Sequence, residues 1–590
     1  MADFRRHATG GERNASLASM SGDPWKAAML GLIGALIIVV ALTFRDYGMS
    51  WDEPHSASNG TFYLSWFTSG FSDHRVIDSD VQRLYGSFFN FISTIARRIS
   101  PLEPWETTHL LLAIFGIVGV VFAFRLASLL GGSRAGFLTA AALTLTPAYY
   151  GHSFMNPKDL PFAVLFIASI YYLVRAYDDF PTLNRRAVIS LGLAFGLSLG
   201  VRAGAIMLFG YFAVLLVLWQ ATQYVKRGHD SLNSMPKNVL TGAKGFLLVA
   251  VLAWAVMLIW WPYAQLSPLL NPLRAMRTLA HFTYWPETVL YRGAFVWGSK
   301  VPWHYLPTWF LITLPEFYFL GFALGLLVVL LRGRQPARIP PHHSTDIATK
   351  VAFLVFAVLF PVIVAIVMHP VLYDAQRHFL FLIPLLAVLV GVGVSSFFEI
   401  LPGWPTTAAA AALAVSAVLT IVDMVRLHPY QYVYFNRSFG GLPAALGRYE
   451  TDYWGLSYKE GTDWLVRHYE PRADSVPVRV ANTSIRELTS YYLDRYPSRF
   501  QSVEPTDNPD VVLATTRWDR HLKYPGRPLY VVKRLGIPLL YVIEVKSRSE
   551  KRRFWAEQRS DLILPGLDSF TLHPRTHAGS LKQNCKASNH

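Results

Sequence analysis

The chain has 590 residues, of which 52% are hydrophobic and only 16% are charged. This composition excludes a string of soluble domains and predicts a polytopic membrane protein. The single cysteine, Cys585, excludes an internal disulfide framework, and the net charge of +16 falls largely in short loops and the N-terminal tail, where basic residues set topology rather than indicate nucleic acid.

The polar N-terminus, residues 1–24, is predicted to be a cytoplasmic tail. The first apolar run after it is long for a signal-peptide core and lacks a small-residue cleavage site, so it is interpreted as a retained span. Several later runs are short enough to require tilting or merging. We expect about 11 transmembrane helices within residues 25–425, in apolar runs at 28–44, 109–130, 136–150, 160–176, 188–199, 206–220, 246–261, 309–331, 351–368, 379–398 and 408–422.

The loops support this topology. Alternate connections carry clusters of arginine and lysine, as the positive-inside rule requires of cytoplasmic loops. The opposite connections are longer and rich in Trp, Tyr, Pro and His, beginning with a first outer loop at residues 45–105. An odd number of spans leaves everything after about Asp423 on the outer side.

The C-terminal portion has a different pattern. Short strands are predicted at 476–481, 510–515, 529–533 and 538–545, the last two forming a hairpin around Gly536, with helical spacing at 458–469 and 484–492. These elements predict a small extracytoplasmic α/β domain at residues 426–546. Residues 547–590 are polar and basic and are expected to form a tail without stable structure.

Three acidic residues and a histidine follow the first span. Asp46, Asp52, Glu53 and His55 lie just beyond the predicted membrane edge. Carboxylates at this depth can act on the reactive head of a lipid-borne substrate. The alternative is a solvated loop with ordinary surface charges.

Further polar residues lie at the outer ends of other spans. Asp159 precedes Pro161 at the start of the fourth span, where a carboxylate could act in a site or could only cap the helix. Arg202 lies between two apolar runs. An arginine buried there is unfavourable unless it pairs with an acid or lines a polar cavity, so it is a candidate site residue. The alternative is that its side chain snorkels to the membrane surface. Lys158, Arg377 and His378 could meet an anionic lipid head.

This set of residues resembles the GT-C superfamily of integral-membrane glycosyltransferases. The resemblance rests on Trp51–Glu53 in the first outer loop and on Asp159–Pro161, and the topology agrees with it. The protein O-mannosyltransferase-like and lipid A aminoarabinose transferase-like branches are the most similar. The segments LYRGAFVWGSKVPWHYLP, HPYQYVYFN and RYETDYWGLSYKEG resemble a bacterial subgroup of phospholipid-carrier-dependent glycosyltransferases.

The resemblance implies a reaction and roles for the residues. A sugar would pass from a polyprenyl-phosphate donor to an acceptor hydroxyl with inversion, with Asp52 as general base, Glu53 beside it and Asp159 as a second acid that orients donor or acceptor. The donor phosphate would contact the four cationic candidates, Arg202, Lys158, Arg377 and His378. Polyprenyl phosphate is a good leaving group, so a single carboxylate base can suffice.

The expected partners are the lipid bilayer, the polyprenyl-phosphate sugar, and an acceptor that is a protein, lipid or glycan. No cofactor is expected; a divalent metal stays an open alternative without support, because the loop lacks an Asp-x-Asp metal motif. No nucleic acid is expected. The expected location is a bacterial inner membrane with the site facing the periplasm. Alternatives are a lipid-linked oligosaccharide transferase, a polyprenyl-lipid transporter or flippase, and an assembly subunit without transferase activity.

Overall fold

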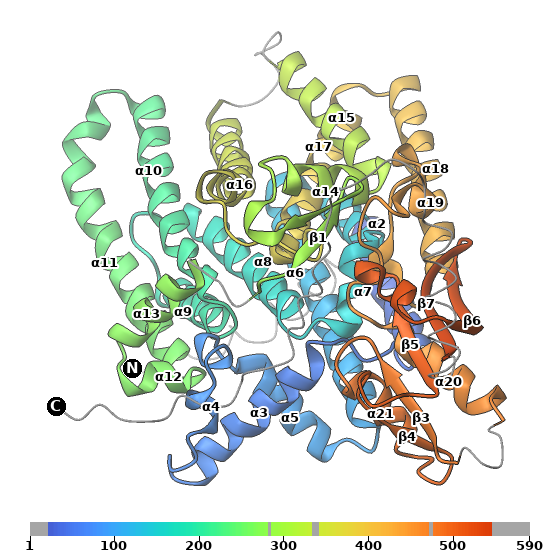
Figure 1. Cartoon of the computed structure of the whole chain (residues 1–590). Coiled ribbons are helices and arrows are strands. Elements are labelled where there is room, and N and C mark those ends of the chain that lie inside the picture. Colours follow the sequence, from blue (N-terminus) through green and yellow to red (C-terminus); the bar gives the residue numbers. More distant parts are fainter. Residues whose placement is uncertain (1–21, 281–284, 333–340, 471–475, 546–590) are drawn as a thin grey trace, which may run out of the picture.

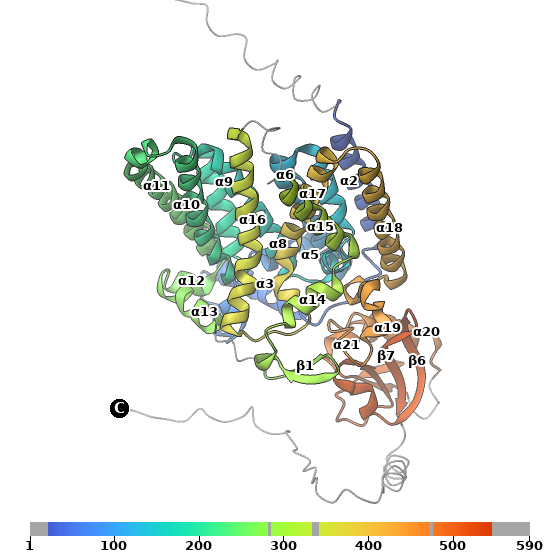
Figure 2. The same cartoon turned by 90° about the horizontal axis from the view of Figure 1, so that it is seen from above.

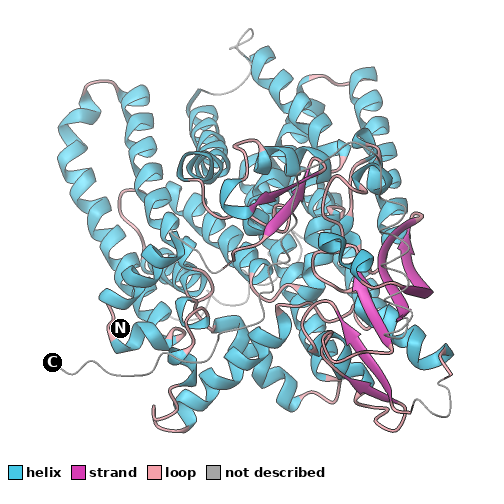
Figure 3. Cartoon of the chain, in the orientation of Figure 1, coloured by secondary structure: helices cyan, strands magenta, loops and turns pink. Residues whose placement is uncertain are grey.

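The computed structural model describes residues 22–280, 285–332, 341–470 and 476–545 (Figure 1). Most of the expected N-terminal tail and all of the expected basic C-terminal tail lie outside these ranges. Long helices form the bulk of the molecule; one group of strands lies together at its edge, and a separate pair lies nearer the middle of the view (Figure 3).

The membrane region is built from long apolar helices. Among the described residues, eight helices are long and apolar enough to cross a membrane, or nine if the bent pair α14 and α15 forms one span. The eight are α2 (Pro24–Thr43), α6 (Pro104–Thr144), α8 (Asp159–Ala176), α10 (Met207–Arg227), α11 (Asp230–Ile259), α16 (Pro341–Met368), α17 (Ile383–Ile400) and α18 (Trp404–Leu427). The bent pair is α14 (Tyr305–Thr313) and α15 (Glu316–Arg332), and the shorter helices α7 (Pro147–Met155) and α9 (Arg185–Leu199) complete the bundle.

The polytopic helical fold is therefore confirmed, with fewer candidate spans than the eleven apolar runs. Two of those runs fall largely in α6, whose halves meet at a kink, and α9 has only 15 residues. At the kink Gly132 adopts φ 74° and ψ 178°, a conformation open essentially only to glycine. The break lets one continuous helical segment change direction.

The core of the membrane region surrounds α8 and α17. In the most apolar window of each helix, 83% of α8 and 72% of α17 is buried within the protein, against 17% of α2 and 22% of α18. Helices α6 and α17 pack against each other, and α8 packs against α6 and α9. The peripheral helices expose apolar side chains, as expected of surfaces that face lipid.

Shorter elements cover one end of the bundle. They are α3 (Glu53–Thr68), α4 (Arg75–Asp78), α5 (Phe88–Ile99), α12 (Pro262–Leu266), α13 (Leu270–Ala280) and the antiparallel pair β1 (Thr288–Tyr291) and β2 (Ala294–Trp297). In Figure 2, α12, α13, β1 and the C-terminal sheet lie toward one end, and the turn between α10 and α11 lies at the other. The long predicted outer loops thus share the end that carries the sheet.

The C-terminal portion is a mixed five-stranded sheet with small helices. Its order is β4-β3-β5-β7-β6, parallel from β4 to β5 and antiparallel from β5 to β6. Four of its strands confirm the predicted ones; β4 was not predicted, because three residues give too little pattern. The elements are α19 (Gly441–Ala445), α20 (Ser457–His468), β3 (Val478–Asn482), α21 (Glu487–Leu493), β4 (Phe500–Ser502), β5 (Val511–Thr515), β6 (Gly526–Arg534) and β7 (Ile537–Val545).

The predicted β6–β7 hairpin is also confirmed. Its turn places Leu535 at φ 50° and Gly536 at φ 80°, the pair of left-handed residues that a tight two-residue hairpin favours. A single hydrophobic core runs from the membrane helices into this sheet, and includes Trp454, Leu456 and Leu513. The sheet is therefore packed directly on the membrane region.

Candidate active site

Asp52 lies at the N-terminus of α3 but does not cap it. Its side chain is only 8% exposed, with Oδ1 3.6 Å from Lys158 Nζ and Oδ2 3.1 Å from Arg377 Nη1. Burial raises the pKa of this carboxyl, but Lys158, Arg377, His55 and Arg202 together outweigh burial and lower the pKa to about 2. Asp52 is therefore an ionised carboxylate at neutral pH.

Glu53 faces a different part of the protein. Its Oε2 accepts a hydrogen bond from the Ser50 backbone N–H at 2.7 Å, and its Oε1 lies 3.1 Å from Nε2 of His109 on α6. The side chain is fully buried. Glu53 thus fixes the start of α3 against α6 rather than joining the cations around Asp52.

Asp159 is the first residue of α8 and is 2% exposed. Asn156 holds this turn: its Oδ1 accepts from the Asp159 backbone N–H at 2.8 Å, and its Nδ2 donates to Asp159 Oδ2 at 2.9 Å. The other carboxylate oxygen of Asp159 pairs with Arg202 Nη2. The side chain therefore does not cap its own helix and is free to hold an arginine.

Arg202 precedes the short helix η3 (Ala203–Ile206), which joins α9 to α10. Besides its pair with Asp159, it has an Nε without a hydrogen-bond partner among the described residues. The side chain also lines a cavity. Arg202 thus pairs with an acid and lines a cavity, and it does not extend to the membrane surface as a snorkelling side chain would.

Arg377 opens η6 (Arg377–Leu382), directly before α17, and is 4% exposed. Its Nε lies 3.3 Å from Asp374 Oδ2, and its guanidinium lies 4.7 Å from the ring centre of Tyr373 and 4.6 Å from that of Trp454. Asp374 and its neighbour Ala375 adopt left-handed φ values of 57° and 62°. Non-glycine residues adopt this conformation rarely, and such strain concentrates at functional sites.

The C-terminal portion also reaches the cluster. Arg517, the first residue of η9 (Arg517–Lys523), pairs with Asp374, and its Nε lies 3.3 Å from Glu450 Oε1. Sequence reasoning missed the roles of Arg517, Glu450 and Trp454. The last two lie in the segment RYETDYWGLSYKEG, which could be marked only as a subgroup signature, and Arg517 carried no signal.

A cavity of about 500 Å³ adjoins the cluster. Arg202 and His378 are its ionisable nitrogen-bearing lining residues, and most other lining residues are apolar. Three residues that line it on α16, Phe360, Val364 and Met368, are also 38% to 62% exposed. The cavity therefore reaches the apolar outer surface of the helices, where lipid would lie.

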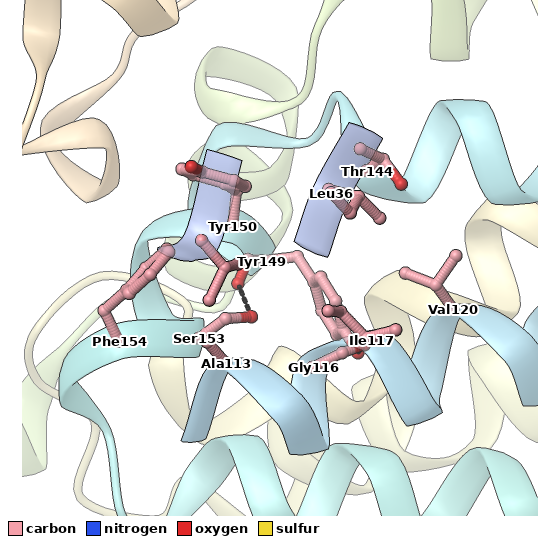
Figure 4. Close-up of a pocket in the computed structure, with 11 residues that line it drawn as sticks. Leu36, Ala113, Gly116, Ile117, Val120, Thr144, Tyr149, Tyr150, Ser153 and Phe154 are labelled. Atoms are coloured by element: carbon pink, nitrogen blue, oxygen red, sulfur yellow. Dashed lines mark hydrogen bonds between the residues drawn. The ribbon is translucent and has the colours of Figure 1, made fainter. Parts of the chain in front are cut away.

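A second cavity is small and far less polar. It lies between α2, α6 and α7, holds about 20 Å³, and is lined by Leu36, Val120 and Phe154 among others (Figure 4). Ser153 Oγ donates to the Tyr149 carbonyl at 2.8 Å beside it. With no charged lining residue and room for about one water molecule, it offers no chemistry.

The structure thus brings together Asp52, Lys158, Asp159, Arg202, Arg377 and His378, and places Glu53 to one side. Within the described ranges, no group of three or more His, Cys, Asp or Glu side chains is arranged to hold a metal ion. The site combines buried carboxylates, cations and an apolar cavity.

Residues 106–261 match the sequence model of the dolichyl-phosphate-mannose-protein mannosyltransferase family. The match covers about a quarter of the chain, and over this segment the chain is similar to that family of glycosyltransferases. The matched segment contains Lys158, Asp159 and Arg202, and it confirms the GT-C resemblance predicted from sequence. The family's enzymes use sugar donors that are linked to a lipid phosphate.

Other comparisons add less. No curated protein sequence matches the chain. ArnT from Cupriavidus metallidurans bound to undecaprenyl phosphate is 15% identical, with a TM-score of 0.43 over 87% of this chain and 98% of ArnT. The oligosaccharyltransferase AglB from Archaeoglobus fulgidus, in complex with an inhibitory peptide and a dolichol-phosphate, is 12% identical, with a TM-score of 0.41 over 82% of this chain and 69% of AglB.

Proposed function

We propose that this glycosyltransferase moves a sugar from a polyprenyl-phosphate donor to an acceptor hydroxyl, with Asp52 as the general base. The observation that carries the proposal is the cavity that reaches the lipid-facing surface and ends on Arg202 and His378, beside the buried, ionised Asp52. An apolar cavity that ends on an arginine and on a hydrogen-bonding imidazole suits an isoprenoid chain that carries an anionic head.

The donor would bind with its lipid chain along the apolar wall of the cavity. Its phosphate would contact Arg202 first, with Lys158, Arg377 and His378 as further contacts. Cations fixed in place before reaction stabilise the charge that develops on a leaving phosphate, and in a site shielded from water this effect is large. The sugar would then lie between the phosphate and Asp52, with Asp159 holding Arg202 in position.

Asp52 would take the proton from the acceptor hydroxyl as that oxygen attacks the anomeric carbon and the phosphate leaves. Direct attack inverts the anomeric centre. In the free protein the cations keep Asp52 a weak base, with a pKa of about 2. A donor phosphate that shares Lys158 and Arg377 would raise that pKa, because two anions would then compete for the same cations. Donor binding would thus strengthen the base.

The proposal assigns residues 25–425 to the catalytic membrane region and residues 426–546 to an outer domain. The sheet end of the molecule would face the periplasm of a bacterial inner membrane. This placement is supported by the basic residues in the loops of the opposite end and by the aromatic-rich loops of the sheet end. The acceptor, whether protein, lipid or glycan, would approach from the same side as the sheet.

The test is transfer of radiolabelled sugar from a panel of polyprenyl-phosphate sugars by purified protein in lipid nanodiscs, with a membrane extract as the source of acceptors. Asp52→Asn should lower transfer on the order of 10² to 10⁴-fold, the usual effect of losing a general base. Asp46→Asn is the matched control: Asp46 lies in the same loop, is half exposed and pairs with His428.

Equal transfer by Asp52→Asn and wild type would remove Asp52 from the role of base. Binding of polyprenyl lipid by both proteins without consumption of any donor would replace the transferase with a transporter or assembly subunit. Transfer only from donors that carry a whole oligosaccharide would favour an oligosaccharide transferase.

A further inference from the structure

A row of alternating charges runs from Asp52 to the C-terminal sheet. Asp52 Oδ2 lies 3.1 Å from Arg377 Nη1, and Arg377 Nε lies 3.3 Å from Asp374 Oδ2. The other oxygen of Asp374 accepts from Arg517 Nη2. Arg517 Nε in turn lies 3.3 Å from Glu450 Oε1. Arg377 and Arg517 each lie between two carboxylates, and Asp374 lies between the two arginines.

The groups in this row are deeply buried. The side chain of Asp374 is 0% exposed, that of Arg377 is 4% exposed and that of Arg517 is 10% exposed. Loss of one partner of a buried ion pair is strongly unfavourable, because the remaining charge stays buried without compensation. The position of the Arg377 guanidinium therefore depends on which other cation pairs with the Asp374 carboxylate.

Arg517 is itself held from several sides. Its Nη1 donates to the Tyr453 carbonyl at 2.9 Å, and its guanidinium lies 4.1 Å from the ring centre of Trp518. Trp518 Nε1 donates to the Thr288 carbonyl of β1 at 2.7 Å. These contacts fix η9 between the C-terminal sheet and the β1–β2 hairpin, so Arg517 meets Asp374 in a set orientation.

We infer that Arg517 is a positioning residue for the sugar transfer proposed above, on which this inference rests. By occupying Oδ1 of Asp374, Arg517 limits Arg377 to one carboxylate oxygen and leaves Nη1 of Arg377 for Asp52. Without Arg517, Arg377 turns to hold both oxygens of Asp374, the bidentate geometry that arginine favours. Asp52 then keeps only Lys158 at close range and shifts from its catalytic position.

The C-terminal portion therefore shapes the active site through η9, although it lies outside the bundle of membrane helices. Arg517 does not contact the substrate. It acts on Asp52 through two intervening side chains, those of Asp374 and Arg377. A contact of this kind makes transfer depend on the docking of the sheet domain against the membrane helices.

The experiment compares Arg517→Met, Arg517→Lys and the control Arg527→Met in the full-length protein, with kcat and the KM for donor measured per folded molecule. Arg527 lies in the same domain and is 73% exposed in its pair with Glu544. We expect Arg517→Met to lower kcat on the order of 100-fold, the effect of moving a reacting group by about 1 Å. The KM for donor should change much less, and Arg517→Lys should restore part of kcat.

A folded Arg517→Met that transfers sugar at the wild-type kcat overturns the inference. So does a loss of activity that matches the loss of folded protein, because that result indicates a structural role only. If Arg517→Met does not fold, the same comparison is made with Arg517→Lys: a folded Arg517→Lys with the wild-type kcat overturns the inference. Failure of the proposed function gives a different pattern, in which wild type transfers from no donor or Asp52→Asn remains active.

Discussion

Glu450 is a buried carboxyl in the row of charges whose ionisation falls within the ordinary pH range. Burial raises its pKa to about 7; Arg517 opposes this shift, and Asp374 adds to it. Tyr305 of α14 and Tyr453 are the other ionisable groups that face this part of the site. Between pH 4.5 and 7 the folded protein thus holds a proton that the unfolded chain has released.

Stability should therefore fall as pH rises through this window. Glu450→Gln keeps the shape of the side chain and removes its charge, so its stability relative to wild type should increase from pH 5 to pH 8. Thermal unfolding in detergent at intervals of one pH unit measures this difference. Glu487→Gln, at an exposed position on α21, should show no such trend. A stability difference for Glu450→Gln that is the same at every pH would contradict the prediction.

Some residues of the candidate site could be predicted from the sequence, and others could not. Asp52 and Asp159 could be singled out because each belongs to a short motif beside an apolar run, Trp51–Glu53 and Asp159–Pro161, that resembles a known family. Arg517 could not be predicted, since its partner Asp374 is 143 residues away and no local pattern connects them. The sequence could not separate Glu53 from Asp52, because the partners that turn Glu53 away from the cations are the Ser50 backbone N–H and His109 on α6, which no local pattern identifies.

At the scale of elements, the kink in α6 depends on one backbone conformation. Gly132 adopts φ 74°, and a Cβ added there would meet no atom within 4 Å, so a substitution would be strained but not crowded. Gly132→Ala should destabilise the protein by about 1 to 3 kcal/mol, the cost of forcing a side chain into this region. Thermal unfolding of the purified protein measures the effect.

Gly34→Ala is the matched control for the kink. Gly34 lies within α2, also has open space around its Cβ position, and has an ordinary helical φ. Alanine is the better helix former there, so Gly34→Ala should leave stability unchanged or raise it slightly. A Gly132→Ala protein as stable as Gly34→Ala would show that the kink does not need glycine.

Hydropathy predicted where the helices are but not how they are arranged. The eleven apolar runs all fall on helices, yet the glycine kink joins two of them. Among the candidate spans in the described ranges, α8 has the lowest mean hydropathy, 1.6, and is the most buried, at 83%. In a bilayer both lipid and protein interior are apolar, so hydropathy does not distinguish a central helix from a peripheral one.

At the scale of the whole molecule, the site is shared by two parts of the chain that are far apart in sequence. The connection between α9 and α10 supplies Arg202 at the cavity, η6 supplies Arg377, and η9 of the C-terminal portion supplies Arg517. A polyprenyl phosphate bound at Arg202 and Arg377 should therefore stabilise both parts together, because a ligand that binds only the folded state shifts the unfolding equilibrium.

Hydrogen exchange should report this coupling. Adding undecaprenyl phosphate to wild type should slow amide exchange in residues 202–207 and also in η9, residues 517–523, although η9 lies outside the cavity. Undecaprenol, which has the same chain without the phosphate, should leave η9 unchanged. In Arg517→Met, protection by undecaprenyl phosphate should persist at 202–207 and disappear from η9, because the link through Asp374 is cut. Protection of η9 in wild type by undecaprenol as well would show that the lipid chain, and not the row of charges, connects the two parts.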